Sequence, residues 1–187
     1  MEETLQSSLQ EGESILWRGK AEAFETLDKT HKNHFIKNTV ISSIIAIVCA
    51  IFLFSTGGFE TKSFVLTLII AVLCMIPSIN VLQDASKLRK MEYIATTDRL
   101  IVLRDAVRSA YYSQIHEGAF LEDEDGHISL ACGKDALKAK PYKRREICVV
   151  GAGTSESGNE IERFCFYAPT DRDALTKILH EKMPAIF

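Results

Sequence analysis

The amino-acid sequence predicts an α+β membrane protein, with a two-helix transmembrane hairpin and a small antiparallel β-barrel or sandwich that a C-terminal amphipathic helix caps. Three observations favour this class: two long windows without a charged residue, a series of short β-prone runs, and helical spacing near the end of the chain. With 187 residues, the chain has room for one ordinary domain and a short extra element. We expect a cytosolic N-terminal segment with a short strand and a juxtamembrane helix at residues 1–38, the hairpin at 39–83, and a cytosolic domain at 84–187.

The two uncharged windows have the length and the composition of membrane-spanning helices. No charged residue lies between Lys37 and Glu60, residues 39–54 are apolar on every side of a helix, and the second window runs from Ser63 to Gln83. About 20 residues, at about 1.5 Å each, cross about 30 Å of hydrocarbon. A core helix of a soluble domain needs only an apolar stripe, so a buried hairpin in a soluble protein is the less favoured alternative.

Polar residues interrupt the second window near its C-terminal end, at Pro77, Ser78 and Asn80. Pro77 lacks a backbone donor, and we expect a kink there, because neighbouring groups can satisfy the freed carbonyl in a membrane helix. We also expect the Asn80 side chain to bond across to the first helix.

The connection between the windows, at residues 57–62, is too short for a domain, so the two helices are expected to run antiparallel. Both ends of the chain then lie on one side of the membrane. Basic residues flank the two windows, whereas the connection holds Lys62 alone, and the positive-inside rule therefore places both termini in the cytosol. The flanking basic residues are Lys29, Lys32, Lys37, Lys87, Arg89 and Lys90.

Short β-prone runs follow the second window. Residues 91–96 and 99–104 flank Thr97-Asp98 and predict a tight hairpin, in which Arg99 pairs with a nearby group. A second hairpin is expected around the acidic turn at 122–126. The expected strands are 91–96, 99–104, 107–112, 119–121, 127–131, 147–150 and 163–168.

Helical spacing returns near the end of the chain. Leu175, Ile178 and Leu179 fall on one side, which predicts an amphipathic helix whose apolar stripe covers one end of a sheet or open barrel. Thr170 and Asp173 have the spacing of a capping box at the start of this helix.

Two short motifs lie on either side of the hairpin. The first, EGESILWRG at residues 11–19, has Gly-Glu, two apolar residues, Trp and Gly at fixed spacing. The second, YIATTDRLIV at residues 93–102, has Tyr, Thr and Arg at fixed spacing before apolar residues. In this order around a transmembrane pair, the motifs resemble those of the bacterial pleckstrin-homology-like (bacterial PH domain) membrane proteins.

This resemblance implies a PH-like barrel closed by the C-terminal helix, in a protein of the bacterial inner (cell) membrane. It also implies that the hairpin is an insert, which separates residues 11–19 from a barrel that begins near Met91. Residues 133–158 depart from the pattern, because they form a longer and more irregular segment than a compact barrel needs. The fold hosts lipid binding, peptide binding and scaffolding, and does not choose among them.

A basic run in the domain is the candidate lipid-binding site. Six cationic residues fall within twelve positions, and Asp135 alone opposes them there. Each basic residue near an anionic membrane surface contributes about 1 kcal/mol, and the anchor keeps the domain within reach of that surface. A solvated loop face is the alternative explanation. The six residues are Lys134, Lys138, Lys140, Lys143, Arg144 and Arg145.

The remaining polar features do not indicate catalysis or metal binding. His31 and His34 lie three positions apart without a third ligand nearby, and the acidic turn lacks the spacing of a calcium loop. None of the five cysteines forms a CxxC pair, so we interpret them as structural, with a redox or acylation site as the alternative. No catalytic motif is present, and we expect no enzyme, no cofactor and no metal.

These observations predict a membrane-anchored binding or scaffold module that acts at the cytosolic membrane face through protein or anionic-lipid contacts. The expected partners are membrane lipids and a protein partner or a homo-oligomer. Nucleic acid is not expected, because the net charge is −3 and only Tyr142 interleaves with the basic run. The alternative is a subunit of an oligomeric membrane transporter or pore, although the spans lack the ionisable residue that such pathways usually contain.

Overall fold

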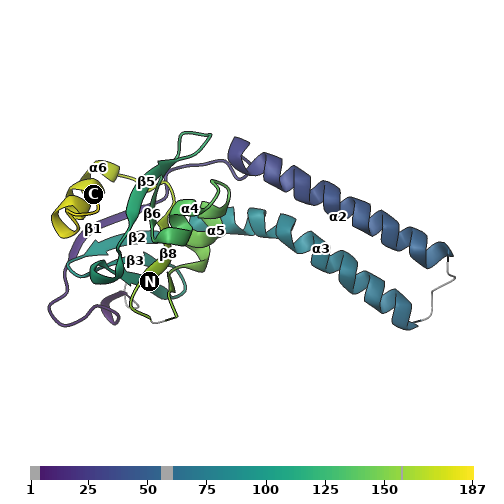
Figure 1. The fold of residues 1–187 in the computed structure, drawn as a ribbon, viewed down its shortest axis with the longest axis horizontal. Coiled ribbons are helices and arrows are strands. Elements are labelled where there is room, and N and C mark those ends of the chain that lie inside the picture. Colours follow the sequence, from purple (N-terminus) through teal and green to yellow (C-terminus); the bar gives the residue numbers. More distant parts are fainter. Residues whose placement is uncertain (1–4, 56–60, 157) are drawn as a thin grey trace. The chain divides into compact units, whose positions relative to one another are not determined.

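The computed structural model describes residues 5–55, 61–156 and 158–187. It is an α+β protein with two long apolar helices and two four-stranded antiparallel sheets (Figure 1). The connection that the sequence places between the long helices, at residues 57–62, lies largely outside the described residues.

Two compact units make up the chain. The sheet unit combines Met1–Glu25 with Asp84–Phe187, and the helical unit is Thr26–Gln83. The hairpin is therefore an insert, because one strand of the sheet unit precedes it and the others follow it. The chain divides at residue 25, before the boundary expected at residue 38, since the helix begins well before the first uncharged window.

The helical unit contains α2 (Lys29–Ser55) and most of α3 (Thr61–Leu88), whose last turn from Asp84 belongs to the sheet unit. Their 27 and 28 residues each extend about 40 Å, which exceeds the hydrocarbon thickness of a bilayer. Large apolar side chains are exposed along both helices, among them Ile47 at 58% and Leu66 at 61%. Both helices are long and apolar enough to span a membrane, where lipid would cover these side chains.

Hydrogen bonds join the two long helices near the proline inside α3. The Ser42 hydroxyl donates to the Cys74 carbonyl oxygen at 2.5 Å, and the hydroxyls of Thr39 and Ser78 lie 3.2 Å apart. The helix continues through Pro77, and the Ser42 hydroxyl bonds the carbonyl next to that of Leu73, the one that the proline leaves without its helical donor. The bond expected from Asn80 to the first helix is not found in the part of the chain that the structure describes.

The first sheet contains strands from both sides of the insert. Its order is β1 (Ile15–Lys20), β2 (Glu92–Thr96), β3 (Arg99–Leu103) and β4 (Val107–Tyr111), with every neighbouring pair antiparallel. β1 pairs with β2 in a register that sets Arg18 opposite Ile94 and Gly19 opposite Tyr93. The hairpin therefore separates two strands that are neighbours in the sheet.

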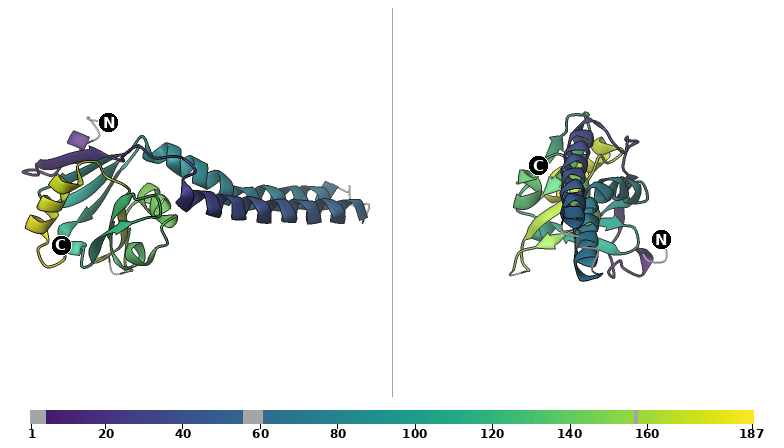
Figure 2. Two further views of the ribbon diagram at one scale, coloured as in Figure 1. Left: turned by 90° about the horizontal axis from the view of Figure 1, so that it is seen from above. Right: turned by 90° about the vertical axis from the view of Figure 1, so that its right-hand side faces the viewer.

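The second sheet has the order β5 (Gly118–Glu122), β6 (Ile128–Cys132), β8 (Ile161–Phe166) and β7 (Gly153–Thr154). A 3₁₀ turn, η1 (Tyr112–Gln114), follows β4, and two short helices, α4 (Lys134–Lys138) and α5 (Lys143–Val150), separate β6 from β7 in sequence. The last helix is α6 (Arg172–Lys182). It lies alongside β1 and contacts that strand (Figure 2).

The strand expected at residues 147–150 is wrong, because these residues form the second half of α5. A short apolar run does not distinguish a strand from a buried stretch of helix. In the helix, Cys148 and Val149 are buried whereas Glu146 and Val150 are exposed, so one helical face covers β8.

The capping box expected at the start of α6 is also wrong. The Thr170 side-chain oxygen accepts a hydrogen bond from the backbone N–H of Lys20 at 3.1 Å. Asp171 precedes the helix with a φ of +51°, and no side-chain capping bond forms there. The threonine therefore binds the end of β1, a contact that spacing within the helix does not reveal.

A stack of aromatic rings occupies the core of the sheet unit. Tyr93 of β2 stacks on Phe166 of β8 with ring centroids 4.7 Å apart, and Trp17 of β1 stacks on the same ring at 6.2 Å. All three rings are buried. A Cβ atom on Gly19 would collide with the Trp17 ring, which explains why glycine follows the tryptophan at this spacing.

A buried ion pair between Glu13 and Arg99 links the segment before the insert to the strands after it. Arg99 donates from Nη2 to Glu13 Oε2 at 2.8 Å and from Nε to Oε1 at 2.9 Å. The Thr96 hydroxyl donates to the same carboxylate at 2.6 Å. These bonds, those of Arg99 foremost, lower the pKa of Glu13 from 4.5 to about 2. Arg99 therefore has a partner, as expected, but that partner is Glu13, which lies 86 positions away in the sequence.

The same pair holds the N-terminal segment against the first sheet. Arg99 Nη2 also donates to the Ser8 carbonyl oxygen at 2.6 Å. Upstream, Leu5 is only 3% exposed and belongs to a small apolar cluster on the outer face of the sheet, whose other buried members are Ile94, Ile101 and Leu103. β2 and β3 are therefore buried on both faces.

The Glu13 carboxylate predicts a specific loss of stability in acid. Its folded-state pKa lies below its unfolded value, so its contribution is present above about pH 4.5 and disappears as the pH falls towards 2, a loss of about 3 kcal/mol. We expect Glu13→Gln to lose this pH-dependent part, whereas Glu11→Gln, at an exposed position, keeps it. Thermal unfolding of the full chain in detergent, followed by Trp17 fluorescence from pH 6 to 2, measures both. Equal pH dependence in Glu13→Gln and the unchanged chain would contradict the assignment.

Candidate functional site

The fold divides the basic run into exposed and buried members. Lys134 and Lys138 lie on α4, Lys140 lies in the connection, and Lys143 begins α5, and all four are exposed. The two arginines that follow, Arg144 and Arg145, are 6% and 1% exposed. Including these two arginines in a lipid-facing set is therefore wrong, because both lie on the buried side of α5.

Arg144 fastens α5 to the end of β5. Its Nη1 donates to the carbonyl oxygens of Leu121 and Glu122, at 3.1 and 3.0 Å. These carbonyls lie where the strand passes into the acidic turn, so the arginine links α5 to the start of a chain reversal.

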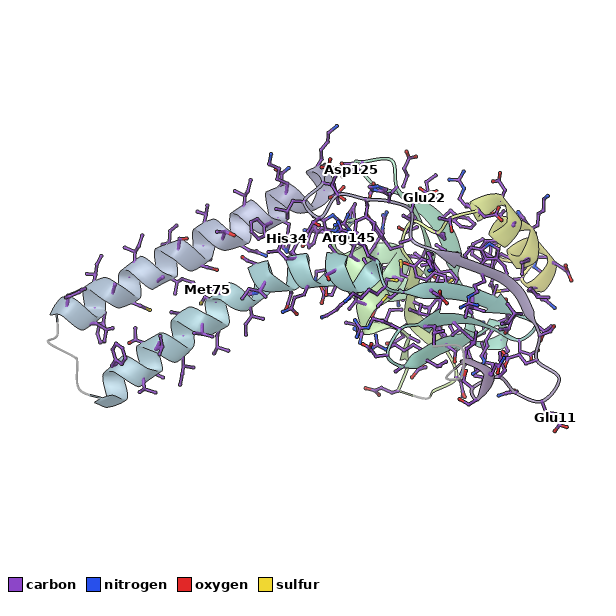
Figure 3. All side chains as sticks on the ribbon, turned by 180° about the vertical axis from the view of Figure 1, so that it is seen from behind. Glu11, Glu22, His34, Met75, Asp125 and Arg145 are labelled. Carbon is purple, nitrogen blue, oxygen red and sulfur yellow. The ribbon has the colours of Figure 1, made fainter. Side chains whose placement is uncertain are left out.

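Arg145, labelled in Figure 3, lies beside two aromatic rings that are nearly perpendicular to each other. Its guanidinium carbon is 4.4 Å from the Phe24 centroid and 4.9 Å from the Tyr167 centroid. Nη2 also donates to the Glu25 carbonyl oxygen at 3.2 Å and to the Tyr167 hydroxyl at 3.1 Å. The planar guanidinium thus stacks and bonds at once, a role that lysine cannot fill.

A second arginine, from the opposite end of the insert, also contacts the Phe24 ring. Arg89, which directly follows α3, lies over the Phe24 ring at 5.4 Å and donates to the Phe24 carbonyl oxygen at 3.2 Å. Phe24 precedes α2 by a few residues. The stretches of the sheet unit that enter and leave the insert are therefore joined at one phenylalanine.

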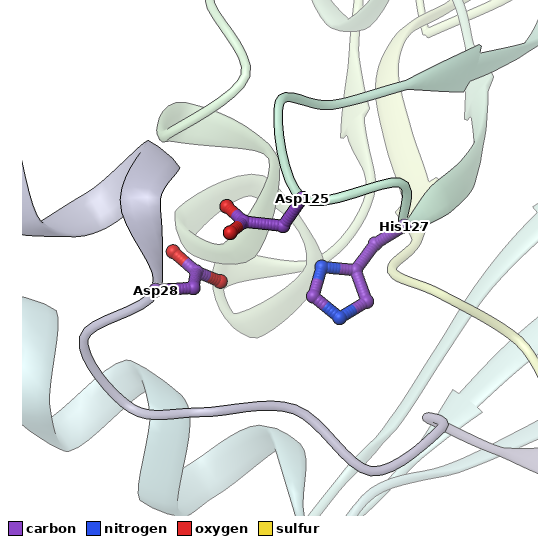
Figure 4. Close-up of side chains that lie close together, drawn as sticks. All are labelled: Asp28, Asp125 and His127. Carbon is purple, nitrogen blue, oxygen red and sulfur yellow. The ribbon is translucent and has the colours of Figure 1, made fainter.

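The acidic turn between β5 and β6 is organised by Asp123. Its Oδ1 accepts from the backbone N–H groups of Asp125 and His127 at 3.0 and 2.9 Å, and its Oδ2 accepts from the Tyr167 hydroxyl at 3.2 Å. Figure 4 shows the Asp125 and His127 side chains on this turn. Asp123 is buried and serves the turn itself, as a local hydrogen-bonding aspartate does.

The two histidines near the start of α2 have different partners. His31 receives its contacts from Asp28, whose Oδ1 accepts from the His31 backbone N–H at 2.9 Å and lies 2.6 Å from His31 Nδ1. His34 Nε2 lies 3.0 Å from the Asn38 amide nitrogen. Asp28 therefore satisfies a donor of the first helical turn.

A cleft lies beside α5 and brings together three lysines of the basic run. Its volume is 460 Å³. α4, the connection to α5, α5 itself and β8 supply its walls. The lining residues are Asp135, Lys138, Ala139, Lys140, Tyr142, Lys143, Glu146, Ile147 and Arg163. Lys134 lies outside this lining although it belongs to the same run in sequence.

Arg163 is a cleft residue that the sequence analysis missed. It lies on β8, twenty positions beyond Lys143, and its register partner on β7 is Gly153. A Cβ atom on Gly153 would lie 2.6 Å from Arg163 Nε and 2.8 Å from Cγ, so the arginine side chain lies directly over the glycine. Only the strand pairing brings these residues together, and no local pattern in the sequence signals it.

The cations of the cleft are available to a ligand. Among the described residues, Lys138, Lys140, Lys143 and Arg163 form no ion pair with a carboxylate, although Asp135 and Glu146 line the same cleft. Four unpaired cations around one concave surface attract an anion, and their lysine and arginine N–H groups can donate charge-assisted hydrogen bonds to its oxygens.

The cysteines of the sheet unit belong to its core. Cys132, Cys148 and Cys165 are buried. Burial raises the pKa of the Cys132 thiol to about 12 and that of Cys148 to about 11, so both are protonated at neutral pH. Protonated, buried thiols are poor nucleophiles and poor metal ligands, in keeping with a structural role.

Comparisons with known proteins do not assign this site. No protein-family model, no curated protein and no solved structure matches the chain. The resemblance to bacterial PH-like membrane proteins stays a prediction.

The division of the basic run predicts opposite outcomes for neighbouring substitutions. Arg145→Ala removes two hydrogen bonds and a stacked cation from a buried site, and we expect it to lower the free energy of unfolding by about 3 kcal/mol. Lys143→Ala, at an exposed position, is expected to change it by less than about 0.5 kcal/mol. Thermal unfolding of the full chain, followed by Trp17 fluorescence, measures the difference. Equal effects of the two substitutions would overturn the division.

Proposed function

We propose that the chain is an integral protein of the bacterial inner membrane in which the α2–α3 hairpin holds a PH-like binding or scaffold module at the cytosolic face, without enzymatic activity. Anionic lipid headgroups are its proposed contact, and a protein partner is the other candidate. The observation that carries the proposal is the insertion of two membrane-length helices between the paired strands β1 and β2.

The position of the insert supports an anchoring role. Eight residues separate β1 from α2, and three separate α3 from β2. At about 3.5 Å per residue, these connections extend at most about 28 Å and about 10 Å. If the helices span a bilayer, the sheet unit stays within tens of ångströms of its surface, which raises the local concentration of headgroups around it.

Strand pairing supports a PH-like barrel. The chain beyond β1 continues along the segment after β8, since Ala21 bridges Pro169 and the Thr170 backbone N–H donates to the Lys20 carbonyl oxygen at 2.8 Å. This bridge connects the first sheet with the second. α6 then buries Leu175 and Leu179 in the shared core, as a helix that closes a barrel would.

The exposed lysines support contact with anionic lipid. Lys134, Lys138, Lys140 and Lys143 lie on α4, on α5 and in the connection between them, and each contributes about 1 kcal/mol near an anionic surface. The transporter alternative gains no comparable support. The hydroxyls that join α2 to α3 bond with groups of the same hairpin, so they do not mark a path for a substrate.

Reporter fusions test the proposed orientation. We expect green fluorescent protein fused after Phe187 to fluoresce in bacterial cells, and alkaline phosphatase at the same position to be inactive, because both termini face the cytosol. Alkaline phosphatase inserted after residue 58 is expected to be active. The reverse pattern, or release of the chain from membranes by alkaline carbonate, would refute the anchoring model.

Residue-level labelling tests the lipid contact. In nanodiscs containing phosphatidylglycerol, we expect a water-soluble amine reagent to modify the four exposed lysines severalfold more slowly than in phosphatidylcholine nanodiscs, because headgroup contact shields them. Lys177, exposed on α6, serves as the control and is expected to react equally in both. Mass spectrometry of the full chain reads out each lysine. Identical rates in the two lipids would reject the lipid version.

A further inference from the structure

We propose that the cleft beside α5 is a binding site for phosphate monoesters, with Lys138, Lys140, Lys143 and Arg163 as the groups that hold the phosphate. This inference deepens the proposed function, because it assigns a ligand class and an anchoring arginine to the surface that carries the exposed lysines. It depends on that function only through the shared lysines.

The charge of the cleft fits a dianion. Four cations and two carboxylates line it, which leaves a net formal charge of +2. A phosphate monoester carries a charge of about −1.5 to −2 at neutral pH, with oxygens that accept several charge-assisted hydrogen bonds. A phosphate diester carries a single charge and would leave the cleft uncompensated.

The size and walls of the cleft indicate an ester and not a bare ion. Its 460 Å³ falls within the range of about 300 to 1,000 Å³ that is usual for small-molecule sites. Ala139, Tyr142 and Ile147 supply apolar wall that a phosphate alone would not use. The carboxylates of Asp135 and Glu146 can accept hydrogen bonds from hydroxyl groups, which favours a hydroxylated organic part.

Arg163 is the member of the set that the fold places most specifically. The three lysines lie within six positions of one another in the sequence, on or between two short surface helices, whereas Arg163 reaches the cleft from β8. Its path over β7 requires that Gly153 have no side chain. The fold therefore combines a guanidinium, which binds phosphate in a fixed geometry, with flexible lysines.

Titration of the detergent-solubilised full chain with glycerol 3-phosphate, followed by isothermal calorimetry, tests the site without a bilayer. We expect saturable binding that is tighter than that of inorganic phosphate, and a loss of about tenfold or more in Arg163→Gln, because hydrogen bonds to charged groups are strong. Arg172→Gln on α6 removes the same charge outside the cleft and is expected to bind normally. No saturable binding, or an equal loss in both variants, would overturn the proposal.

A double-mutant cycle tests Gly153 as a positioning residue. We expect Gly153→Ala to weaken glycerol 3-phosphate binding in the unchanged chain and to have no further effect in Arg163→Gln, because the added methyl group acts only by moving Arg163. Additive losses in the double variant would reject this role. An unchanged unfolding midpoint of Gly153→Ala shows that any loss is local.

The source of the ester is identified by competition. Phosphatidic acid in phosphatidylcholine nanodiscs is expected to displace glycerol 3-phosphate if the site takes a lipid headgroup, and not to displace it if the site takes a soluble ester. Both results keep the phosphate-monoester site, because each starts from glycerol 3-phosphate that is already bound. If the lysines are shielded in nanodiscs but glycerol 3-phosphate does not bind, the proposed lipid contact is supported and the phosphate-monoester site is rejected. If glycerol 3-phosphate binds but the lysines are not shielded, the phosphate-monoester site is supported and the lipid contact is rejected.

Discussion

The buried pair of Glu13 and Arg99 is the interaction on which the sheet unit depends. A carboxylate and a guanidinium removed from water are costly unless their hydrogen bonds are nearly all satisfied. Here Thr96, the Ser8 carbonyl and the ion partners themselves supply those bonds. Either charge alone would be buried without compensation, so the segment before the insert and the strands after it are stable only together.

A second set of contacts, at Phe24, lies beyond the end of β1 that is opposite the ion pair. Arg89 and Arg145 both lie over this ring, and each also binds backbone carbonyl oxygen in residues 24–25. The contacts tie the residues that precede the insert to the residue that follows α3. Arg145 shares α5 with cleft residues Lys143 and Glu146, so one short helix presents a buried face to the junction and an exposed face to the cleft.

The sequence predictions that succeeded depend on local patterns, and those that failed depend on tertiary contacts. The two uncharged windows and the β-hairpin around Thr97 are local patterns, and the structure contains both as expected. A short apolar run such as residues 147–150 has too few positions to show whether it is a strand or a helix. The burial of Arg144 and Arg145 depends on which face of α5 packs against the core, and a run of basic residues does not indicate that face. Contacts explain the residues of the two motifs at 11–19 and 93–102. Glu13 of the first binds Arg99 of the second, and Trp17 and Tyr93 stack on the same phenylalanine ring. Arg163 entered the cleft only through its pairing with Gly153, which no spacing in the sequence predicts.

The pairing of β1 with β2 also constrains the order of events during synthesis. Arg18 and its partner Ile94 are separated by 76 positions, with both long helices between them. At about 5 to 20 residues per second, the ribosome needs roughly 4 to 15 s to supply the second strand after the first. During that interval β1 is an unpaired, partly apolar strand beside an emerging hairpin. The sheet unit can therefore be completed only after both helices have been synthesised. A chain stalled within the insert keeps an exposed strand edge, which chaperones and proteases can recognise.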